Sequence, residues 1–409
     1  MTNRPMDGVR VLEVAQFTFA PAAGAALADW GADVIKVEHA VTGDAQRGIR
    51  LGTGGAGVGS FQPLMEHPNR GKRSIGIALE TEEGRALLDE LIAQSDVFLT
   101  SFLPAARAKL RLDIDDVRAV NPRIIYARGS AFGPRGPQSG SGGYDLSAFW
   151  CRGGSAYGAT QIGSPVIAAM PAGAYGDSIG GMTIAGGIAA ALFQRERTGE
   201  PSVVDVSLLS IATWATALSI SSALLAGVDP PQARLDGPPH MAVNPIVGTF
   251  RTADDRFVNL TMLQPGRYWA DVCRHIDRSD LIDDERFDSA EKLFANAADA
   301  GAAVAKAIRA RPYEYWVERF ATLEGQWAPV QSPTEVAADP QVRANGYILA
   351  VIDADGTARE LVSSPVQFDE TPFEITRGPQ FAEHTDEIVL SLGRTTDELL
   401  ELKLAGAIT

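Results

Sequence analysis

Short β-branched runs and helical segments alternate along the first third of the chain, and this alternation restricts the fold more than any other feature. Residues 9–14 read as a strand, 21–30 as a helix that Gly31 ends, and 33–38 as a second strand. The pattern continues with a strand at 74–79, a helix at 81–94 and strands at 96–100 and 124–128. Strands that alternate with helices predict an α/β fold around a parallel sheet. Such sheets bind ligands beyond the carboxyl ends of their strands, so the loops after Val14, Glu38, Leu79 and Thr100 are the predicted site.

One glycine-rich segment, Gly52 to Gly57, has the G-x-G-x-x-G spacing of dinucleotide-binding loops. No strand leads into it, and Pro63 follows in place of the expected helix. The loop after the first strand, AQFTFAP, contains no glycine. The segment is therefore interpreted as a surface loop and not as an NAD site. The pattern G-x-x-x-x-G-K-[ST] does not occur in the sequence, which removes the main support for nucleotide hydrolysis.

Acidic residues outnumber basic ones by 51 to 36, which gives a net charge of −15. Such a surface repels phosphate backbones and anionic lipid, so neither nucleic acid nor a membrane is an expected partner. The two cysteines, Cys151 and Cys273, are far apart, and the histidines show no metal-ligand spacing. These features argue against a disulfide scaffold and a metal site. Because the start of the chain lacks a basic segment followed by an apolar run, a cytoplasmic protein is expected.

Two uncharged segments raise the question of a membrane span. Residues 178–193 are few for a span and rich in Gly and Ala. Residues 208–228 are numerous enough, but six Ser and Thr side chains lower their hydropathy. Both segments are interpreted as buried helices.

Prolines at positions 230, 231, 238 and 239 mark a linker in the second half of the chain. The following segment, IVGTFRTADDRFVNL, and the helical stretches up to about Leu323 read as a second, α+β unit. A last stretch ends in helices, one of which opens at Thr385 with Asp386 and Glu387 in its first turn. The sequence thus predicts two domains.

Asp177 stands at the start of an apolar, Ala-rich helix that ends near Arg195. A carboxylate in that position is an ordinary helix cap. The same position also suits a nucleophile, because free helix amides would stabilise the oxyanion formed when the carboxylate attacks an acyl group. Composition alone does not separate the two interpretations.

A series of different short motifs follows in a fixed order over almost the whole chain. They are Gly8–Glu13 (GVRVLE), Ala32–Glu38 (ADVIKVE), Gly43-Asp44 with Arg47-Gly48, Asn69–Ser74 (NRGKRS), Asn121-Pro122-Arg123, Gly143-Tyr144-Asp145, Gly176-Asp177 and Glu383–Glu387 (EHTDE). The ordered series resembles the class III coenzyme A transferases of the formyl-CoA transferase and crotonobetainyl-CoA:carnitine CoA-transferase type. The resemblance implies a dimer of interlocked subunits, each with a Rossmann-like large domain built from both chain ends and a smaller inserted α+β domain. The expected boundaries are 1–205 and 331–409 for the large domain, 206–230 for a linker helix and 231–330 for the small domain.

The resemblance also implies an activity and a mechanism. The substrates would be an acyl-CoA and a carboxylic acid, with coenzyme A as a substrate and no tightly bound cofactor. Asp177 would attack the thioester to form an aspartyl acyl anhydride and then an aspartyl-CoA thioester. A carboxylate suits this role because an anhydride keeps the acyl group activated, provided that water is excluded. The breaker-rich segment from Gly133 to Gly143 reads equally well as a cover over the site or as a plain surface loop.

Carried over by position, the coenzyme A contacts fall after the predicted strands. They are Thr18, Phe19, His39, Ile77, Ala78, Leu79, Glu80, Ser101, Phe102, Leu103, Lys109, Gly142, Gly143, Tyr144 and Asp145. The family often has Gln at the place of Thr18 and Arg at the place of His39, so those contacts are expected to be rearranged. Lys109, with Arg47, Lys72 and Arg73 in the neighbouring motifs, is the predicted basic patch for phosphate, although each is also compatible with a solvated surface charge.

Two other functions remain open. α-Methylacyl-CoA racemases share this fold, but their pattern has His-Asp where this chain has Tyr144-Asp145, and tyrosine is a poor base near neutral pH. A non-enzymatic CoA-binding protein is possible only if Asp177 is merely a cap. Among acyl groups, a larger or more apolar one than formyl or oxalyl is favoured, because the segment HMAVNPIVGTF lacks the consecutive glycines of the formyl and oxalyl enzymes.

Overall fold

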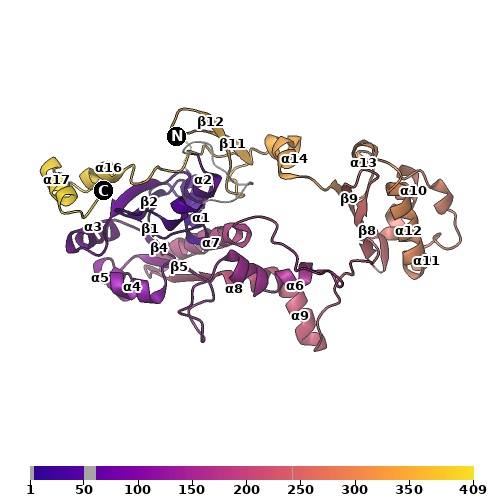
Figure 1. Ribbon diagram of the computed structural model, residues 1–409, viewed down its shortest axis with the longest axis horizontal. Coiled ribbons are helices and arrows are strands. Elements are labelled where there is room, and N and C mark those ends of the chain that lie inside the picture. The colour runs from indigo at the N-terminus through magenta and orange to yellow at the C-terminus, as the bar shows by residue number, and fades with distance from the viewer. Residues whose placement is uncertain (1–3, 50–60, 242) are drawn as a thin grey trace. The chain divides into compact units, whose positions relative to one another are not determined.

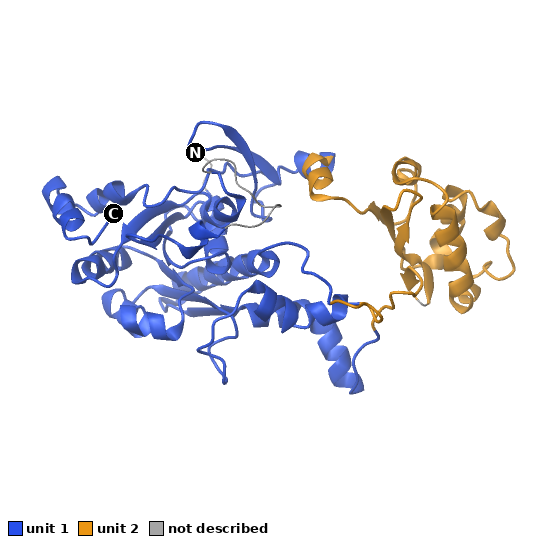
Figure 2. Ribbon diagram, in the orientation of Figure 1, with its two compact units in different colours: residues 1–160, 167–231, 340–409 blue, residues 161–166, 232–339 orange. Residues whose placement is uncertain are grey.

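The computed structural model describes residues 4–49, 61–241 and 243–409, which fall into two compact units (Figure 2). Unit 1 contains residues 1–160, 167–231 and 340–409, and unit 2 contains residues 161–166 and 232–339. The chain therefore returns to unit 1 at Pro340, later than the expected 331. The segment expected as a linker helix, 206–230, belongs to unit 1. The glycine-rich segment 52–57 lies outside the described residues.

A six-stranded sheet forms the centre of unit 1 (Figure 1). Its order is β3-β2-β1-β4-β5-β6, and every neighbouring pair is parallel, which confirms the predicted parallel α/β sheet. The strands are β1 (Arg10–Val14), β2 (Asp33–His39), β3 (Arg73–Ile77), β4 (Val97–Thr100), β5 (Ile125–Ser130) and β6 (Val203–Ser207). The sequence analysis missed β6, an edge strand whose side chains are mostly exposed or half-buried.

Helices surround this sheet. They are α1 (Phe19–Asp29), α2 (Pro63–Asn69), α3 (Glu82–Ala93), α4 (Pro104–Leu110), α5 (Ile114–Val120), α6 (Ser155–Ala159), α7 (Tyr175–Thr198), α8 (Leu208–Ala215), α9 (Ala217–Ala226), α15 (Pro340–Ala344), α16 (Thr385–Ser391) and α17 (Thr396–Leu404). Shorter elements are the 3-10 turn η1 (Ala45–Gly48), the π-helix η2 (Asp145–Cys151) and the hairpin β11 (Ile348–Ile352) with β12 (Ala358–Val362). Pro63 is the first residue of α2, so the expectation that this proline stands in place of a helix is wrong. Proline is tolerated there because the backbone N–H that it lacks has no partner at the first helical position.

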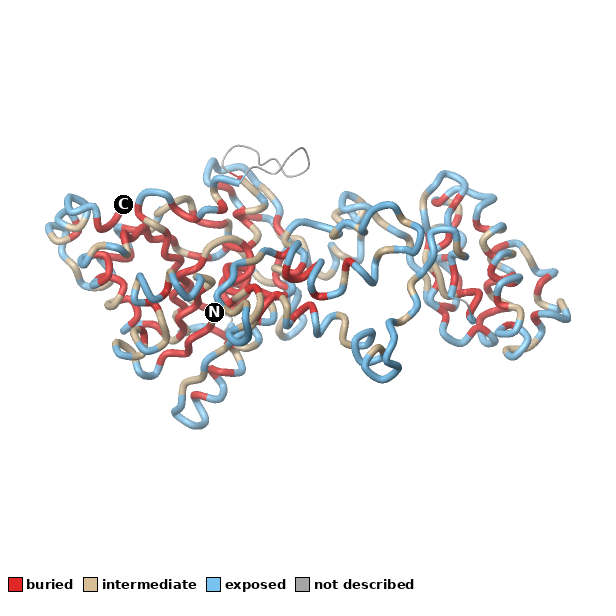
Figure 3. Tube along the Cα trace, turned by 60° about the horizontal axis from the view of Figure 1, so that its bottom comes forward, coloured by how far each residue is buried: buried red, intermediate tan, exposed pale blue. Residues whose placement is uncertain are grey.

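The buried residues of unit 1, which are among those coloured red in Figure 3, form two main hydrophobic clusters. Neighbouring strand residues belong to opposite clusters: Val11 packs with α1, α7 and α8, and Leu12 packs with α3, α5 and α16. This is the expected alternation of side chains across a strand. The sheet is therefore covered by helices on both faces, and its carboxyl edge is left to the connecting loops.

Small residues allow α1 and α7 to pack closely. A Cβ added to Gly180 would lie 2.3 Å from Cε2 of Phe19, and one added to Gly181 would lie 2.5 Å from Cβ of Ala22. By length and composition α7 could cross a membrane, and so could α8 and α9 together, which are bent by 69° at their junction. α7 packs against α1 and the sheet, which agrees with the buried helix predicted for residues 178–193. The same prediction for residues 208–228 is wrong for α9, in which no residue is buried.

A cluster of charged side chains is buried between β1, β2 and β3. The Lys36 ammonium lies 3.3 Å from Oε1 of Glu13 and 2.8 Å from Oδ2 of Asp44, and all three side chains are fully inaccessible. Lys72 binds both oxygens of Glu13 at 2.7 and 2.8 Å. Although burial alone would lower it, the carboxylates of Asp44, Glu13 and Glu38 raise the pKa of Lys36, so this ammonium stays charged.

Unit 2 has its own core beneath a four-stranded antiparallel sheet of order β10-β9-β8-β7. Its buried residues include Phe250, Trp269 and Trp316. The elements are β7 (His240–Met241), β8 (Asn244–Arg251), β9 (Phe257–Thr261), α10 (Pro265–His275), η3 (Ser279–Leu281), α11 (Ala290–Ala295), α12 (Ala297–Ile308), α13 (Tyr313–Phe320), β10 (Trp327–Pro329) and α14 (Pro333–Ala338). This is the α+β pattern that the sequence indicated after its proline-rich linker.

Replacing Lys36 tests the buried cluster. Lys36→Met should lower the free energy of unfolding by about 3–5 kcal/mol, because it leaves the Asp44 carboxylate buried without its cation and removes one of the two lysines paired with Glu13. The matched control is Lys403→Met, which removes a partly exposed ion pair with Asp386 and should change the stability little. Urea unfolding followed by circular dichroism measures both values, and equal losses would contradict the assignment.

Candidate active site

Asp177 lies in the first turn of α7 and lines a cavity in unit 1. Burial raises the pKa of its carboxyl group, and the negative charge of Asp145 raises it further, to about 7. No cap hydrogen bond from its side chain is found among the described residues, and the residue at the N-cap position is Ala174. The carboxyl group is therefore a partly buried acid facing a cavity, in contrast to the ordinary cap that the sequence also allowed.

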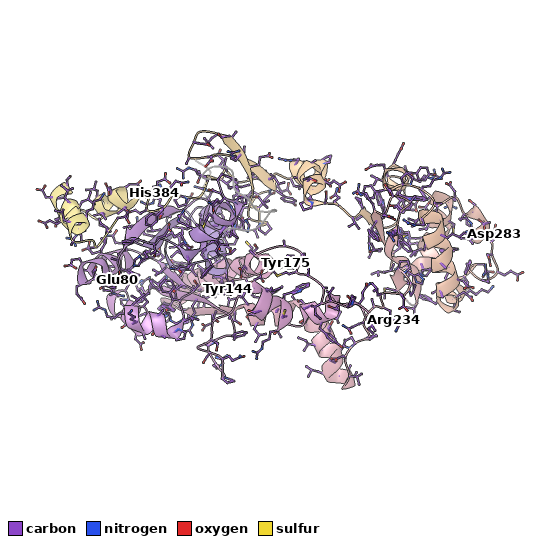
Figure 4. All side chains as sticks on the ribbon, viewed as in Figure 1. Glu80, Tyr144, Tyr175, Arg234, Asp283 and His384 are labelled. Atoms are coloured by element: carbon purple, nitrogen blue, oxygen red, sulfur yellow. The ribbon has the colours of Figure 1, made fainter. Side chains whose placement is uncertain are left out.

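Asp145, the first residue of η2, caps α7 instead. The Gly176 amide donates to both of its carboxylate oxygens at 3.1 Å. Burial raises the pKa of Asp145, and hydrogen bonds from the amides of Gly176, Asp177 and Tyr175 partly offset that rise. The expectation that free amides of this helix stabilise an oxyanion is therefore wrong, since Asp145 already binds them. Figure 4 labels Tyr144 and Tyr175, which adjoin these elements.

Gly176 is required by this arrangement. A Cβ at this position would lie 2.3 Å from Cγ of Phe149 and 2.5 Å from Oδ1 of Asp145. A side chain here would push the Asp145 carboxylate off the end of α7. These close contacts therefore explain why position 176 is a glycine.

The cavity in front of Asp177 has a volume of about 720 Å³ and lies at the carboxyl edge of the sheet. Its lining includes eight of the residues predicted from the sequence, namely Phe19, Ser101, Phe102, Leu103, Gly142, Gly143, Tyr144 and Asp177. They come from the loops after β1, β4 and β5 and from the start of α7. Part of the breaker-rich segment lines it too, at Gly133, Pro134, Ser139 and Ser141. The structure therefore brings together residues that the chain separates widely.

Other predicted contacts lie outside this lining. Thr18, Ile77, Ala78 and Asp145 are buried. Leu79, half-buried, and Glu80, exposed, follow β3. Lys109 lies near the end of α4, and among the described residues no carboxylate is within ion-pair distance of its ammonium.

His39 ends β2 and is held by its neighbours. Its Nδ1 accepts hydrogen bonds from the amides of Val41 and Thr42, both at 3.2 Å. The ring proton is therefore on Nε2, which lies 3.1 Å from Oε1 of Glu80. In this arrangement the imidazole points its only donor at the Glu80 carboxylate.

The predicted basic patch is wrong for three of its four residues. Arg47 binds both oxygens of Glu38 at 2.7 Å, and Arg73 binds Asp33 at 2.8 Å. Lys72 is fully buried against Glu13. All three side chains pair with carboxylates that lie 9 to 314 residues away in the sequence, so local sequence could not reveal these partners.

Phe17 was not among the predicted site residues, although the loop that contains it was. Phe17 lines the cavity, has a left-handed backbone (φ 66°) and meets the ring of Tyr144 edge to face at 5.4 Å. Its amide donates to Oδ1 of Asp44 at 3.2 Å. A non-glycine residue at positive φ next to a predicted site is a structural signal that no local sequence pattern supplies.

The comparisons with known proteins agree with this geometry. The family model described as CoA-transferase family III matches residues 6–385. The cinnamoyl-CoA:phenyllactate CoA-transferase of Clostridium sporogenes is 30% identical over 401 residues, which cover 97% of this chain and 95% of that protein. The (R)-2-hydroxy-4-methylpentanoate CoA-transferase of Clostridioides difficile is 27% identical over 402 residues, covering 97% and 98%. The crystal structure of a CAIB/BAIF family protein from Brucella suis superposes with a TM-score of 0.82 at 27% identity, covering 96% of this chain and 100% of that one.

The raised pKa of Asp177 predicts a pH-dependent gain in stability for Asp177→Asn. The folded state prefers the neutral carboxyl group, so wild type loses stability relative to the variant as pH rises from about 4 to about 7. The variant should therefore have the higher melting temperature at pH 8, and the difference should shrink at pH 5. Thermal unfolding at both pH values measures this, and a difference that is independent of pH would contradict the raised pKa.

Proposed function

The chain belongs to CoA-transferase family III and is an acyl-CoA:carboxylate CoA-transferase, and on that premise we propose that the transfer proceeds through covalent intermediates on Asp177. The observation that carries the proposal is the Asp177 carboxylate itself, which faces a cavity of about 720 Å³ while Asp145 performs the capping of its helix. A carboxylate freed from capping in this way is available to attack a bound thioester.

In the proposed reaction, a carboxylate oxygen of Asp177 attacks the thioester carbonyl. The C–S bond breaks, coenzyme A leaves as a thiolate, and an aspartyl acyl anhydride remains. The thiolate then attacks the aspartyl carbonyl, which forms an aspartyl-CoA thioester and releases the first acid. The carboxylate of the second acid attacks the carbonyl of that thioester, its C–S bond breaks, and coenzyme A leaves as a thiolate while a second anhydride forms. The thiolate finally attacks the acyl carbonyl of this anhydride and breaks its bond to the Asp177 oxygen. The new acyl-CoA leaves and Asp177 is regenerated, with no proton or electron supplied from outside.

The site would need donors for the oxyanion of each tetrahedral intermediate. The amides of α7 are bound to Asp145, but the N-terminus of α1 adjoins the same cavity through Phe19. No side chain among the described residues caps α1, because the hydroxyl of its N-cap residue, Thr18, donates to Gln46 at 2.9 Å. The partial positive charge at this helix end supports it as the place where the oxyanion is stabilised.

Coenzyme A is proposed to lie along the carboxyl edge of the sheet, with its thiol end toward Asp177. Phe102, Leu103 and Tyr144 offer apolar surface for the pantetheine arm. Lys109 is the proposed phosphate partner, because its ammonium lacks an ion pair within the described structure whereas Arg47, Lys72 and Arg73 are taken up by carboxylates. The binding site therefore depends on fewer cations than the motifs indicated.

A carboxylic acid with an apolar side chain is the proposed substrate class. The segment HMAVNPIVGTF lacks the consecutive glycines of the formyl and oxalyl enzymes, which supports a larger or more apolar acyl group. The relatives named for cinnamoyl-CoA with phenyllactate and for 2-hydroxy-4-methylpentanoate act on acids of this kind. Transfer of formyl-CoA to oxalate at a rate comparable to that of such acids would contradict this part of the proposal.

The proposed active form is a homodimer. Large apolar side chains are exposed along α8 and α9, and they include Trp214, Leu218, Leu224 and Leu225, each more than 80% exposed. A monomer in water rarely exposes such a surface, which indicates that another protein surface covers it. A second copy of the chain is the proposed partner, as the family resemblance implies.

Trapping of the acyl enzyme tests the mechanism. Wild type mixed with 3-phenylpropionyl-CoA and hydroxylamine should gain the mass of a hydroxamate on the peptide that contains Asp177, because hydroxylamine cleaves an anhydride at either carbonyl. Asp177→Ala should lose CoA exchange by at least about 10³-fold while it stays folded. Deuterium uptake at the α-carbon of the acyl group without any label on Asp177 would instead favour racemase chemistry.

The exposed face of α8 and α9 predicts the oligomeric state. Sedimentation of wild type at micromolar concentration should give the mass of a dimer, and Leu225→Asp should shift the protein toward monomer, because a buried unpaired charge is costly. Leu404→Asp, at an exposed leucine of α17, is the matched control and should leave the dimer intact. A wild-type monomer would contradict the proposal.

A further inference from the structure

The chain enters the helix of Asp177 through a strained residue. Ala174, the N-cap of α7, has φ 59° and ψ 27°, a left-handed conformation that residues other than glycine rarely adopt. Strain of this kind persists only where surrounding contacts hold the backbone. Those contacts decide where the first turn of α7, and therefore the Asp177 carboxylate, is placed.

Ser178 supplies one of them. Its hydroxyl donates to the carbonyl oxygen of Ala174 at 2.8 Å, and its amide donates to the same oxygen at 2.9 Å. The two bonds fix the orientation of the Ala174 peptide. Because Ser178 follows Asp177 directly, anything that positions Ser178 also positions the nucleophile.

His67, from α2, holds the Ser178 hydroxyl. Its Nε2 lies 3.1 Å from Oγ of Ser178. The single hydroxyl hydrogen already points at Ala174, so the imidazole must donate, and its proton is on Nε2. Burial, with a smaller contribution from the charge of Arg70, lowers the pKa of His67 to about 4, so the ring stays neutral in the pH range in which the enzyme would work.

A buried ion pair and hydrogen bonds anchor the C-terminal end of α2. Arg70, its C-cap residue, forms a buried ion pair with Asp29 at the end of α1, with an N–O distance of 2.7 Å. The guanidinium also donates to the carbonyl oxygen of His67 at 2.5 Å. Asp29 in turn accepts the amide of Ser364 at 2.9 Å, which ties this ion pair to the C-terminal part of unit 1. His67 therefore extends from a fixed support toward Ser178.

We propose that His67 and Ser178 form a positioning pair that holds the Asp177 carboxylate in place for attack, an inference that rests on the proposed nucleophilic role of Asp177. The first turn of α7 is then held from two sides, by Asp145 at the amide of Gly176 and by His67 at the hydroxyl of Ser178. The carboxylate passes through two kinds of covalent adduct in one turnover and must return to the same place each time. Small displacements of a reacting group lower rates steeply, which gives this support a catalytic consequence.

Two variants at position 67 separate positioning from packing. His67→Leu keeps side-chain volume but removes the donor, and His67→Gln restores an N–H donor near the place of Nε2. His67→Leu should lower kcat on the order of 10- to 100-fold and leave KM for 3-phenylpropionyl-CoA within about twofold. His67→Gln should recover most of the loss. Ser178→Ala should resemble His67→Leu, and the double variant should be no worse than either single one.

The matched control lies in unit 2, where His275 makes the same kind of contact, with Nε2 3.1 Å from Oγ1 of Thr322. His275→Leu should change the melting temperature without lowering kcat. The rate of Asp177 hydroxamate formation in a single turnover is measured in every variant and in wild type. Unchanged labelling in His67→Leu, or equal losses in the Leu and Gln variants that follow the melting temperature, would overturn the positioning pair alone. Failure of wild type to label at Asp177 would overturn the proposed function and this inference together.

Discussion

The site depends most on the buried ion pairs of the Lys36 ammonium with Glu13 and Asp44. The ammonium lies between Glu13 and Asp44 in a region that water does not reach, so each charge needs the others. Asp44 uses its remaining oxygen to accept the amide of Phe17, whose left-handed backbone turns the loop after β1 toward the cavity. Phe17 then meets Tyr144, the residue before Asp145. A charge cluster in the core thus fixes the loop at one wall of the active site.

Asp177 has to meet two opposing requirements. In the proposed mechanism burial would protect an anhydride from water, but it also raises the pKa of the Asp177 carboxyl group to about 7, whereas attack requires the ionised form. The charge of Asp145 adds to this rise in the pKa. Asp145 also accepts the amide of Gly176, so it caps α7 in place of Asp177. The Asp177 carboxyl group is therefore left without a capping bond at the N-terminus of α7. It is also incompletely ionised near neutral pH.

The fold and part of the site were predictable because their signals are local. Alternating runs of apolar residues predicted β1 to β5 and the parallel sheet, and the carboxyl-edge rule led to loops that supply Phe19, Ser101 and Tyr144 to the cavity. The basic patch failed for a definite reason. A lysine in a motif looks the same whether it faces solvent or a buried glutamate, and Lys72 pairs with Glu13 from a strand that is distant in sequence. The His67–Ser178 contact joins residues 111 positions apart, so no spacing rule could have found it.

The sequence by itself determined the parallel α/β sheet, the edge of the sheet at which the cavity lies and the family of the chain. It left Asp177 as either a helix cap or a nucleophile. Periodicity and ordered motifs carry that information because they depend on neighbours along the chain. Only the tertiary structure showed that Asp145, and not Asp177, accepts the amide of Gly176 at the start of α7. It also decided which cations are free and which are paired. These outcomes depend on distances between remote segments, and packing sets those distances.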